Sequence, residues 1–223
     1  MKRILLCVTL ATFGFAGQLC AQESAESELE MVRKLREKGW NDLAKLRIEE
    51  LLKRKDPKLN AALPLELARL NISIARQMDP DQRLALFGEA RAQLEKFIKQ
   101  NQGKSEAALA AVELARVTSY HAQAILSRAM REEETRTRHE KARPAEAMFI
   151  QAGKDLESAI KVIDGVLPNA PASIKTTLEQ EQKEAKFDIA INLFDQAKTY
   201  IDRGKDAVNA ARAGTMTKAT KAF

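Results

Sequence analysis

The sequence has few of the residues that build tight turns, cross-links and metal sites. Its 223 residues include two Cys, two His, nine Gly and six Pro, and only 5% are aromatic. Two cysteines exclude a disulfide-stapled miniprotein and a Cys-rich zinc module. Two histidines leave little material for a His-based metal site or proton relay. The scarcity of Gly, Pro and aromatic residues argues against a β-sandwich or β-barrel, in which turns recur every few residues.

The residues that are abundant suit a helical domain with a hydrophobic core. Hydrophobic residues make up 45% of the chain and charged residues 30%, with 37 Lys+Arg against 31 Asp+Glu. This apolar content is enough for a core, and the mixture of both charge signs argues against disorder over the whole chain. The length fits one large domain or two small ones.

The N-terminal segment has the pattern of a secretory signal peptide. Lys2 and Arg3 precede an apolar run over 4–15, and a polar, acidic stretch follows. We expect cleavage after Ala21, with Ala16 as the alternative site. An uncleaved anchor is the lesser alternative, because twelve helical residues span about 18 Å whereas the hydrocarbon core of a bilayer is roughly 30 Å thick.

Cleavage of a signal peptide over 1–21 would change the composition of the chain. It removes both cysteines and two positive charges, which leaves 202 residues with a net charge of +4 instead of +6. We therefore expect a cysteine-free protein that is periplasmic in, or secreted from, a bacterium. Lipid attachment at Cys20 is an alternative membrane anchor, although Gly17 and Leu19 stand in the reverse of the usual lipoprotein order.

Beyond the signal peptide, apolar residues recur at helical spacing almost throughout. Residues 22–204 are expected to form one helical domain, and 205–223 a frayed basic tail. Within 63–78, two apolar stripes predict a helix that packs against neighbours on both sides. One stripe contains Leu63, Leu67, Leu70, Ile74 and Met78, and the other contains Leu65, Ala68, Ile72 and Ala75.

Prolines, alanines and charges mark the other segments of the chain. Pro64 and Pro144 are expected in the first turns of helices. An Ala-rich helix is expected from Ser105 to Met130, where small side chains permit close helix–helix approach. The charged run over 131–143 has no large apolar residue, so it is either a solvated helix extension or a protruding loop.

One segment resembles the second half of a tetratricopeptide repeat. The pattern is Gly39-x4-Ala44-x3-Ile48-x2-Leu51, with Pro57 beyond it. Weaker echoes are Ala90-x3-Leu94-x2-Phe97, Ala152-x3-Leu156-x2-Ala159 and Ala190-x3-Phe194-x2-Ala197. The alanines lie 46, 62 and 38 residues apart, whereas the family repeats every 34 residues or so. The Trp and Leu-Gly signature of the family's first helix is also missing.

The resemblance is detailed over residues 39–57, and over most of residues 26–203 it is limited to the general pattern of paired helices. It implies an all-α fold of stacked antiparallel helical hairpins, a right-handed α-solenoid of about six to eight helices. In this family the first helices of the hairpins line a concave groove that binds peptides or other proteins. Solenoids need polar capping elements. Either the tail caps the stack, or the chain is a truncated relative of a longer array, or it assembles with another molecule.

The sequence contains no recognisable catalytic or metal-binding motif. His-Glu-x-x-His, Gly-x-Ser-x-Gly and a phosphate-binding Gly loop are all missing, and His121 has no His or carboxylate three or four residues later. We expect no enzyme activity, no cofactor and no metal. The run over 128–143 interleaves six basic with four acidic residues and has no aromatic residue, so nucleic acid is not an expected partner.

These observations favour a protein-binding scaffold of the bacterial envelope. Its partner would be a protein or peptide, and membrane contact would come only from the signal peptide or from lipid at Cys20. Candidate groove residues on the first helices of the hairpins are Arg69, Arg76, Arg116 and Tyr120. The alternative function is an elongated structural helical bundle of the envelope that has no peptide-binding groove.

Overall fold

The computed structural model describes residues 24–200 and 206–222, and within these ranges the regular structure is helical with no strand. This confirms the predicted all-α class. The α-helices of this part are α1 (Ala25–Glu37), α2 (Asn41–Lys53), α3 (Pro57–Gln77), α4 (Pro80–Gln100), α5 (Ser105–Ala129), α6 (Thr135–Val166), α7 (Ala172–Lys198) and α8 (Asp206–Ala222), with a short 3-10 helix at Leu167–Asn169. The predicted signal peptide and Cys20 lie outside the described residues.

Short polar connections set the ends of the first helices. Gly39 follows α1 with a φ of 74°, the left-handed conformation that glycine adopts without strain. Asp56 caps α3, and its carboxylate accepts hydrogen bonds from the backbone N–H groups of Lys58 (2.8 Å) and Leu59 (3.3 Å). Pro57 occupies the first turn of α3, where its missing N–H costs nothing.

Two prolines lie inside helices rather than in their first turns, so this expectation is wrong. Pro64 is within α3 and Pro144 is within α6. Asp56 and Pro57 already provide a complete start for α3, seven residues before Pro64. A proline inside a helix frees the carbonyl four residues earlier. Here that carbonyl belongs to Asn60 or Glu140, both exposed residues, so water can satisfy it.

The charged run over 131–143 contributes to both a turn and a helix. The turn follows α5, and α6 begins at Thr135. The guanidinium of Arg138 donates hydrogen bonds to the backbone carbonyl of Glu132 at 3.0 and 2.8 Å, which ties the turn to the first residues of α6. Of the two alternatives expected for this segment, the loop therefore holds for its first residues and the helix for the rest.

The segment expected to be a frayed basic tail contains the helix α8. It includes six alanines, the residue with the highest helix propensity, which explains how a segment with little apolar pattern is helical. Ala219 is buried, and α8 packs against α7. The high helix propensity of the alanines and the contact with α7 together explain why this segment is helical although its apolar spacing is weak.

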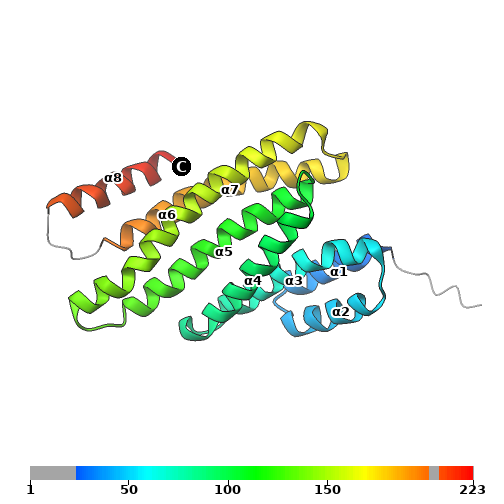
Figure 1. Cartoon of the computed structure of the whole chain (residues 1–223), viewed down its shortest axis with the longest axis horizontal. Coiled ribbons are helices and arrows are strands. Elements are labelled where there is room, and N and C mark those ends of the chain that lie inside the picture. Colours follow the sequence, from blue (N-terminus) through cyan, green and yellow to red (C-terminus); the bar gives the residue numbers. More distant parts are fainter. Residues whose placement is uncertain (1–23, 201–205, 223) are drawn as a thin grey trace, which may run out of the picture.

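The helices pack in chain order from α1 and α2 at one end to α7 and α8 at the other (Figure 1). Each helix contacts the next one, and α1 also contacts α3, α3 contacts α5, and α5 contacts α7. Separate hydrophobic clusters lie between successive helices. The two stripes of α3 confirm the sequence prediction, since Leu63 and Leu70 pack in a cluster with α1 and α2 while Leu65 and Ile72 pack in another with α4 and α5.

The alanines of α5 have the packing role expected from the sequence. Seven of them are buried: Ala107, Ala108, Ala110, Ala115, Ala122, Ala124 and Ala129. Small side chains let α5 pack closely on both α4 and α6, which it contacts extensively. None of the helices in the described ranges is both long enough and apolar enough to cross a membrane.

Candidate functional site

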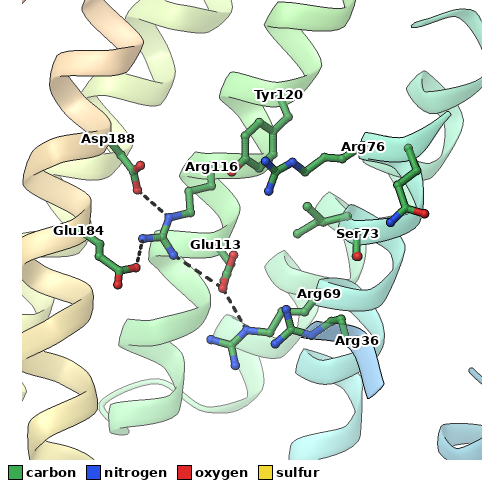
Figure 2. Close-up of a pocket in the computed structure, with 11 residues that line it drawn as sticks. Arg36, Arg69, Ser73, Arg76, Glu113, Arg116, Tyr120, Glu184 and Asp188 are labelled. Carbon is green, nitrogen blue, oxygen red and sulfur yellow. Dashed lines mark hydrogen bonds and ion pairs between the residues drawn. The ribbon is translucent and has the colours of Figure 1, made fainter. Parts of the chain in front are cut away.

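A charged cavity of about 610 Å³ opens among α1, α3, α5 and α7. All four residues proposed from the sequence line it: Arg69, Arg76, Arg116 and Tyr120. Figure 2 shows the two residues of α3 facing the two residues of α5 across this cavity. These four residues, which are up to 51 positions apart in the sequence, meet at one place because α3 and α5 are neighbours in space.

A second, larger cavity of about 1050 Å³ adjoins the first. The two cavities share Arg36, Arg69 and Glu113. The larger one extends past the start of α5, the end of α6 and the first half of α7. We call the two together the odd-helix groove, since most of its lining residues belong to α1, α3, α5 and α7.

Arg116 connects α5 to α7 across the floor of the groove. Its guanidinium donates hydrogen bonds to Asp188 (2.6 Å), Glu181 (2.8 Å) and Glu184 (3.3 Å), all on α7. Burial disfavours the charged guanidinium, but the surrounding carboxylates outweigh this effect and hold the pKa of Arg116 above its ordinary value. Burial also raises the pKa of Glu181, although Arg116 opposes that shift. Arg116 is therefore a charged tether between two helices.

Arg69 forms the corresponding link between α3 and α5. Its Nε donates to Glu113 at 3.0 Å, and its Nη1 donates to Glu66 at 3.2 Å. Glu66 also accepts a hydrogen bond from Arg33 of α1 at 3.0 Å. Oppositely charged side chains thus follow one another from α1 to α7, with Glu113 placed between the guanidinium groups of Arg69 and Arg116 (Figure 2).

Arg76 and Tyr120 differ from these two arginines because they take no part in the ion pairs. Arg76 is exposed, and its guanidinium carbon lies 4.9 Å from the centre of the Tyr120 ring, a cation–π distance. Among the described residues, no carboxylate forms an ion pair with Arg76. Burial raises the pKa of the Tyr120 phenol, so this side chain stays neutral at physiological pH.

Arg36 is a cavity residue that the sequence reasoning missed. It lies on α1, and its Nε is buried without a hydrogen-bond partner. No ion pair to Arg36 occurs within the part of the chain that the structure describes. The signal that could have found it is its position three residues before Gly39, at the end of the first helix of the first hairpin.

The side chains that line the two cavities are mainly charged and hydrogen-bonding groups. In the described ranges, no group of three or more His, Cys, Asp or Glu side chains is arranged to hold a metal ion. His121 is half-buried, and its ring centre lies 6.3 Å from that of Phe87. Burial and, to a smaller extent, Arg91 lower the pKa of His121. This histidine belongs to the packing between α4 and α5, not to the lining of the cavity.

Comparison of this chain with models of known protein families, with curated proteins and with solved structures gives no match.

Proposed function

We propose that this chain is a non-enzymatic scaffold of the bacterial envelope that binds a segment of a partner protein in the odd-helix groove. The fold in this proposal is a stack of antiparallel helical hairpins similar to tetratricopeptide repeats. Each helix packs on its neighbour in sequence, and α1, α3, α5 and α7 also pack on one another in series. In solenoids the contacts are restricted in this way to adjacent repeats.

Local features of the first two hairpins support the resemblance to this family. Gly39 has the left-handed conformation at the turn between α1 and α2. Ala44 on α2 and Ala90 on α4 are fully buried, as expected for the small residue at which the second helix of a hairpin makes close contact. The echo at Ala190 departs from the pattern, because it lies on α7 and its Phe194 is 44% exposed.

The observation that carries the functional proposal is the composition of the groove. Ligand sites for small molecules are lined predominantly by apolar side chains with a few polar groups. This groove is lined instead by charged side chains from four helices, and two of its arginines, Arg36 and Arg76, have no carboxylate partner. Such a surface suits an extended polar ligand such as a protein segment, which can use several separated hydrogen bonds and ion pairs.

The residues of the site have two different roles in this proposal. Arg69 and Arg116 use their guanidinium groups to hold α3, α5 and α7 in place, so they shape the groove. Arg36, Arg76 and Tyr120 are the groups that remain for the partner. A preformed groove reduces the entropy cost of binding, since its walls do not have to be ordered when the partner arrives.

A pull-down from envelope extract tests this function. We would compare the purified protein with Thr177→Trp, which places a large side chain at an exposed position of the groove, and with Ala92→Trp, a matched change on α4. The proposal predicts that a protein captured by the wild type and by Ala92→Trp is lost with Thr177→Trp. Equal capture by all three proteins would contradict it.

A structural spacer without a binding groove is the second candidate function. The continuous row of ion pairs from Arg33 to Asp188 favours it, because such a network stiffens a helical array whether or not the array binds a ligand. The same pull-down distinguishes the two candidates. A spacer would contact its partners through the outer helices, so Ala92→Trp would then reduce capture and Thr177→Trp would not.

A further inference from the structure

We infer that the segment bound in the odd-helix groove is acidic where it meets α1 and α3, and that its carboxylates bind Arg36 and Arg76. This inference rests on the proposed function and adds the chemical class of the ligand. It comes from the pairing of charges at the smaller cavity, whose wall includes four arginines, two of them without a carboxylate partner among the described residues.

The carboxylates of this cavity already interact with arginines of the protein. Glu113 lies between Arg69 and Arg116, and Glu184 and Asp188 both accept hydrogen bonds from Arg116. The two remaining lining cations, Arg36 and Arg76, form no ion pair with any described residue. Arg69 and Arg116 are shared among several carboxylates, whereas Arg36 and Arg76 are the lining arginines that a ligand carboxylate could pair with without displacing one of these.

The state of Arg36 points to a missing acceptor. A buried N–H group that lacks a hydrogen bond costs free energy, and such groups are rare in folded proteins. The Nε of Arg36 is one of them, and it belongs to a side chain that lines both cavities. Because this atom is inaccessible in the present position of the side chain, a ligand carboxylate would reach it, together with a neighbouring N–H of the same guanidinium, when Arg36 turns toward the cavity; the contact then has the bidentate geometry that suits arginine.

Arg76 is prepared for the same type of contact. Its guanidinium carbon lies over the Tyr120 ring at 4.9 Å, and no described carboxylate forms an ion pair with it. Ser73, one turn earlier on α3, also lines the cavity, and its hydroxyl already donates to Asn41. The hydroxyl of Ser73 is therefore already used within the protein, and Arg76 is the charged group available to a ligand here.

The opposite end of the groove has a different charge and limits where the acidic residues can lie. Glu26 and Glu106, in the first turns of α1 and α5, line the larger cavity and are exposed, and neither forms an ion pair with a described residue. A uniformly acidic ligand would be repelled there. The matching ligand is thus a peptide segment whose acidic residues are confined to the end that reaches Arg36 and Arg76.

Fluorescence anisotropy with defined peptides tests this inference. The probe is a fluorescein-labelled, C-terminally amidated octapeptide that has glutamate at positions two and four and otherwise alanine and serine. The control probe has glutamine at the same two positions. We expect the glutamate peptide to bind the purified protein at least tenfold more tightly than the glutamine peptide. Its affinity should fall as salt is added, because exposed charge pairs are screened.

Variants of the protein locate the binding. Arg36→Gln and Arg76→Gln should each weaken binding of the glutamate peptide at least tenfold. Arg143→Gln removes the same charge from an exposed position on α6 and should change the affinity less than twofold. Nuclear magnetic resonance adds a direct readout, since the Nε–H signal of Arg36 should shift when the peptide is added and should not shift with the glutamine peptide.

Several results would overturn the inference. Equal binding of the two peptides would exclude carboxylate recognition, and equal loss of affinity in Arg143→Gln would show attraction to net charge alone. Binding of tripolyphosphate without binding of the glutamate peptide would identify a phosphate site instead. If the peptide test fails while Thr177→Trp still abolishes partner capture, the groove function stands and only the acidic ligand is wrong.

Discussion

Replacement of Arg116 by methionine tests whether this arginine holds α5 and α7 together. Only 13% of the Arg116 side chain is exposed, and it forms ion pairs with Glu113, Glu181 and Asp188 as well as with Glu184. Methionine keeps most of the apolar stem but removes the charge, which leaves these carboxylates facing one another. Breaking a buried charge pair from one side typically costs about 3–5 kcal/mol. We expect a loss of that size in the free energy of unfolding at pH 7.

Urea unfolding followed by far-ultraviolet circular dichroism measures this loss. In a domain of this length, each kcal/mol also lowers the melting temperature by about 2–4 °C. Arg76→Gln is the matched control, because Arg76 lines the same cavity without an ion pair, and its substitution should cost less than about 0.5 kcal/mol. A loss below about 1 kcal/mol for Arg116→Met, or equal losses for both variants, would refute the assigned role.

The loss caused by Arg116→Met should also depend on pH. Burial already raises the pKa of Glu181 in the folded protein. Without Arg116 the clustered carboxylates bind protons more readily in the folded state than in the unfolded state. The variant therefore becomes relatively more stable as the pH falls from 7 through the titration range of these carboxyl groups. A difference that stays constant down to pH 4 would contradict this electrostatic explanation.

Two further predictions concern buried polar contacts outside the groove. Glu28 is fully buried, and although burial alone would raise its pKa, hydrogen bonds from Arg47 and Arg54 hold that pKa below its ordinary value. Glu28→Gln should cost about 2–3 kcal/mol in urea unfolding at pH 7. This cost should disappear as the pH falls below about 4.5 and through the lowered pKa of Glu28. The reason is that a carboxyl group whose pKa is lowered in the folded state stabilises the fold only above that range. A cost that persists unchanged in acid would count against the ion pairs. A Cβ at Gly153 would lie 3.2 Å from the side-chain nitrogen of Asn192, which hydrogen-bonds within the buried contact between α6 and α7. Gly153→Ala should therefore lower the free energy of unfolding by about 1–2 kcal/mol, despite the higher helix propensity of alanine. An unchanged or raised melting temperature for Gly153→Ala would show that the contact yields without cost.

The apolar pattern of the sequence predicts the packing of the helices well. Leu63 and Leu65 belong to different stripes of one helix, and they pack in different hydrophobic clusters. Apolar spacing defines these faces because burial depends on periodicity along a single helix. The positions of Pro64 and Pro144 within helices are not predictable from apolar spacing. Whether a proline starts a helix or lies within it depends on the capping residues before it and on solvent exposure at the freed carbonyl.

The residues that line the cavity are only partly predictable from sequence. The place of Arg76 and Tyr120 in the cavity lining is predictable from their positions on neighbouring first helices. The ion pair of Arg116 with Asp188 does not, because it joins residues 72 positions apart, and helical periodicity carries no information about which helices meet. For Arg36 the sequence offers only its position before Gly39, at the end of the first helix. Only the packing of α1 against α3 makes it a cavity residue with an unpaired N–H.

Site-specific photo-crosslinking in the producing cell tests the central claim most directly. A photoreactive amino acid would replace Glu37 on α1 or Thr177 on α7, two exposed residues that line the groove. Ala92 on α4 and Ala147 on α6 are exposed control positions. The account predicts that both groove positions crosslink to the same partner protein and that neither control position does. Crosslinks from Ala92 and Ala147, with none from Glu37 and Thr177, would contradict it.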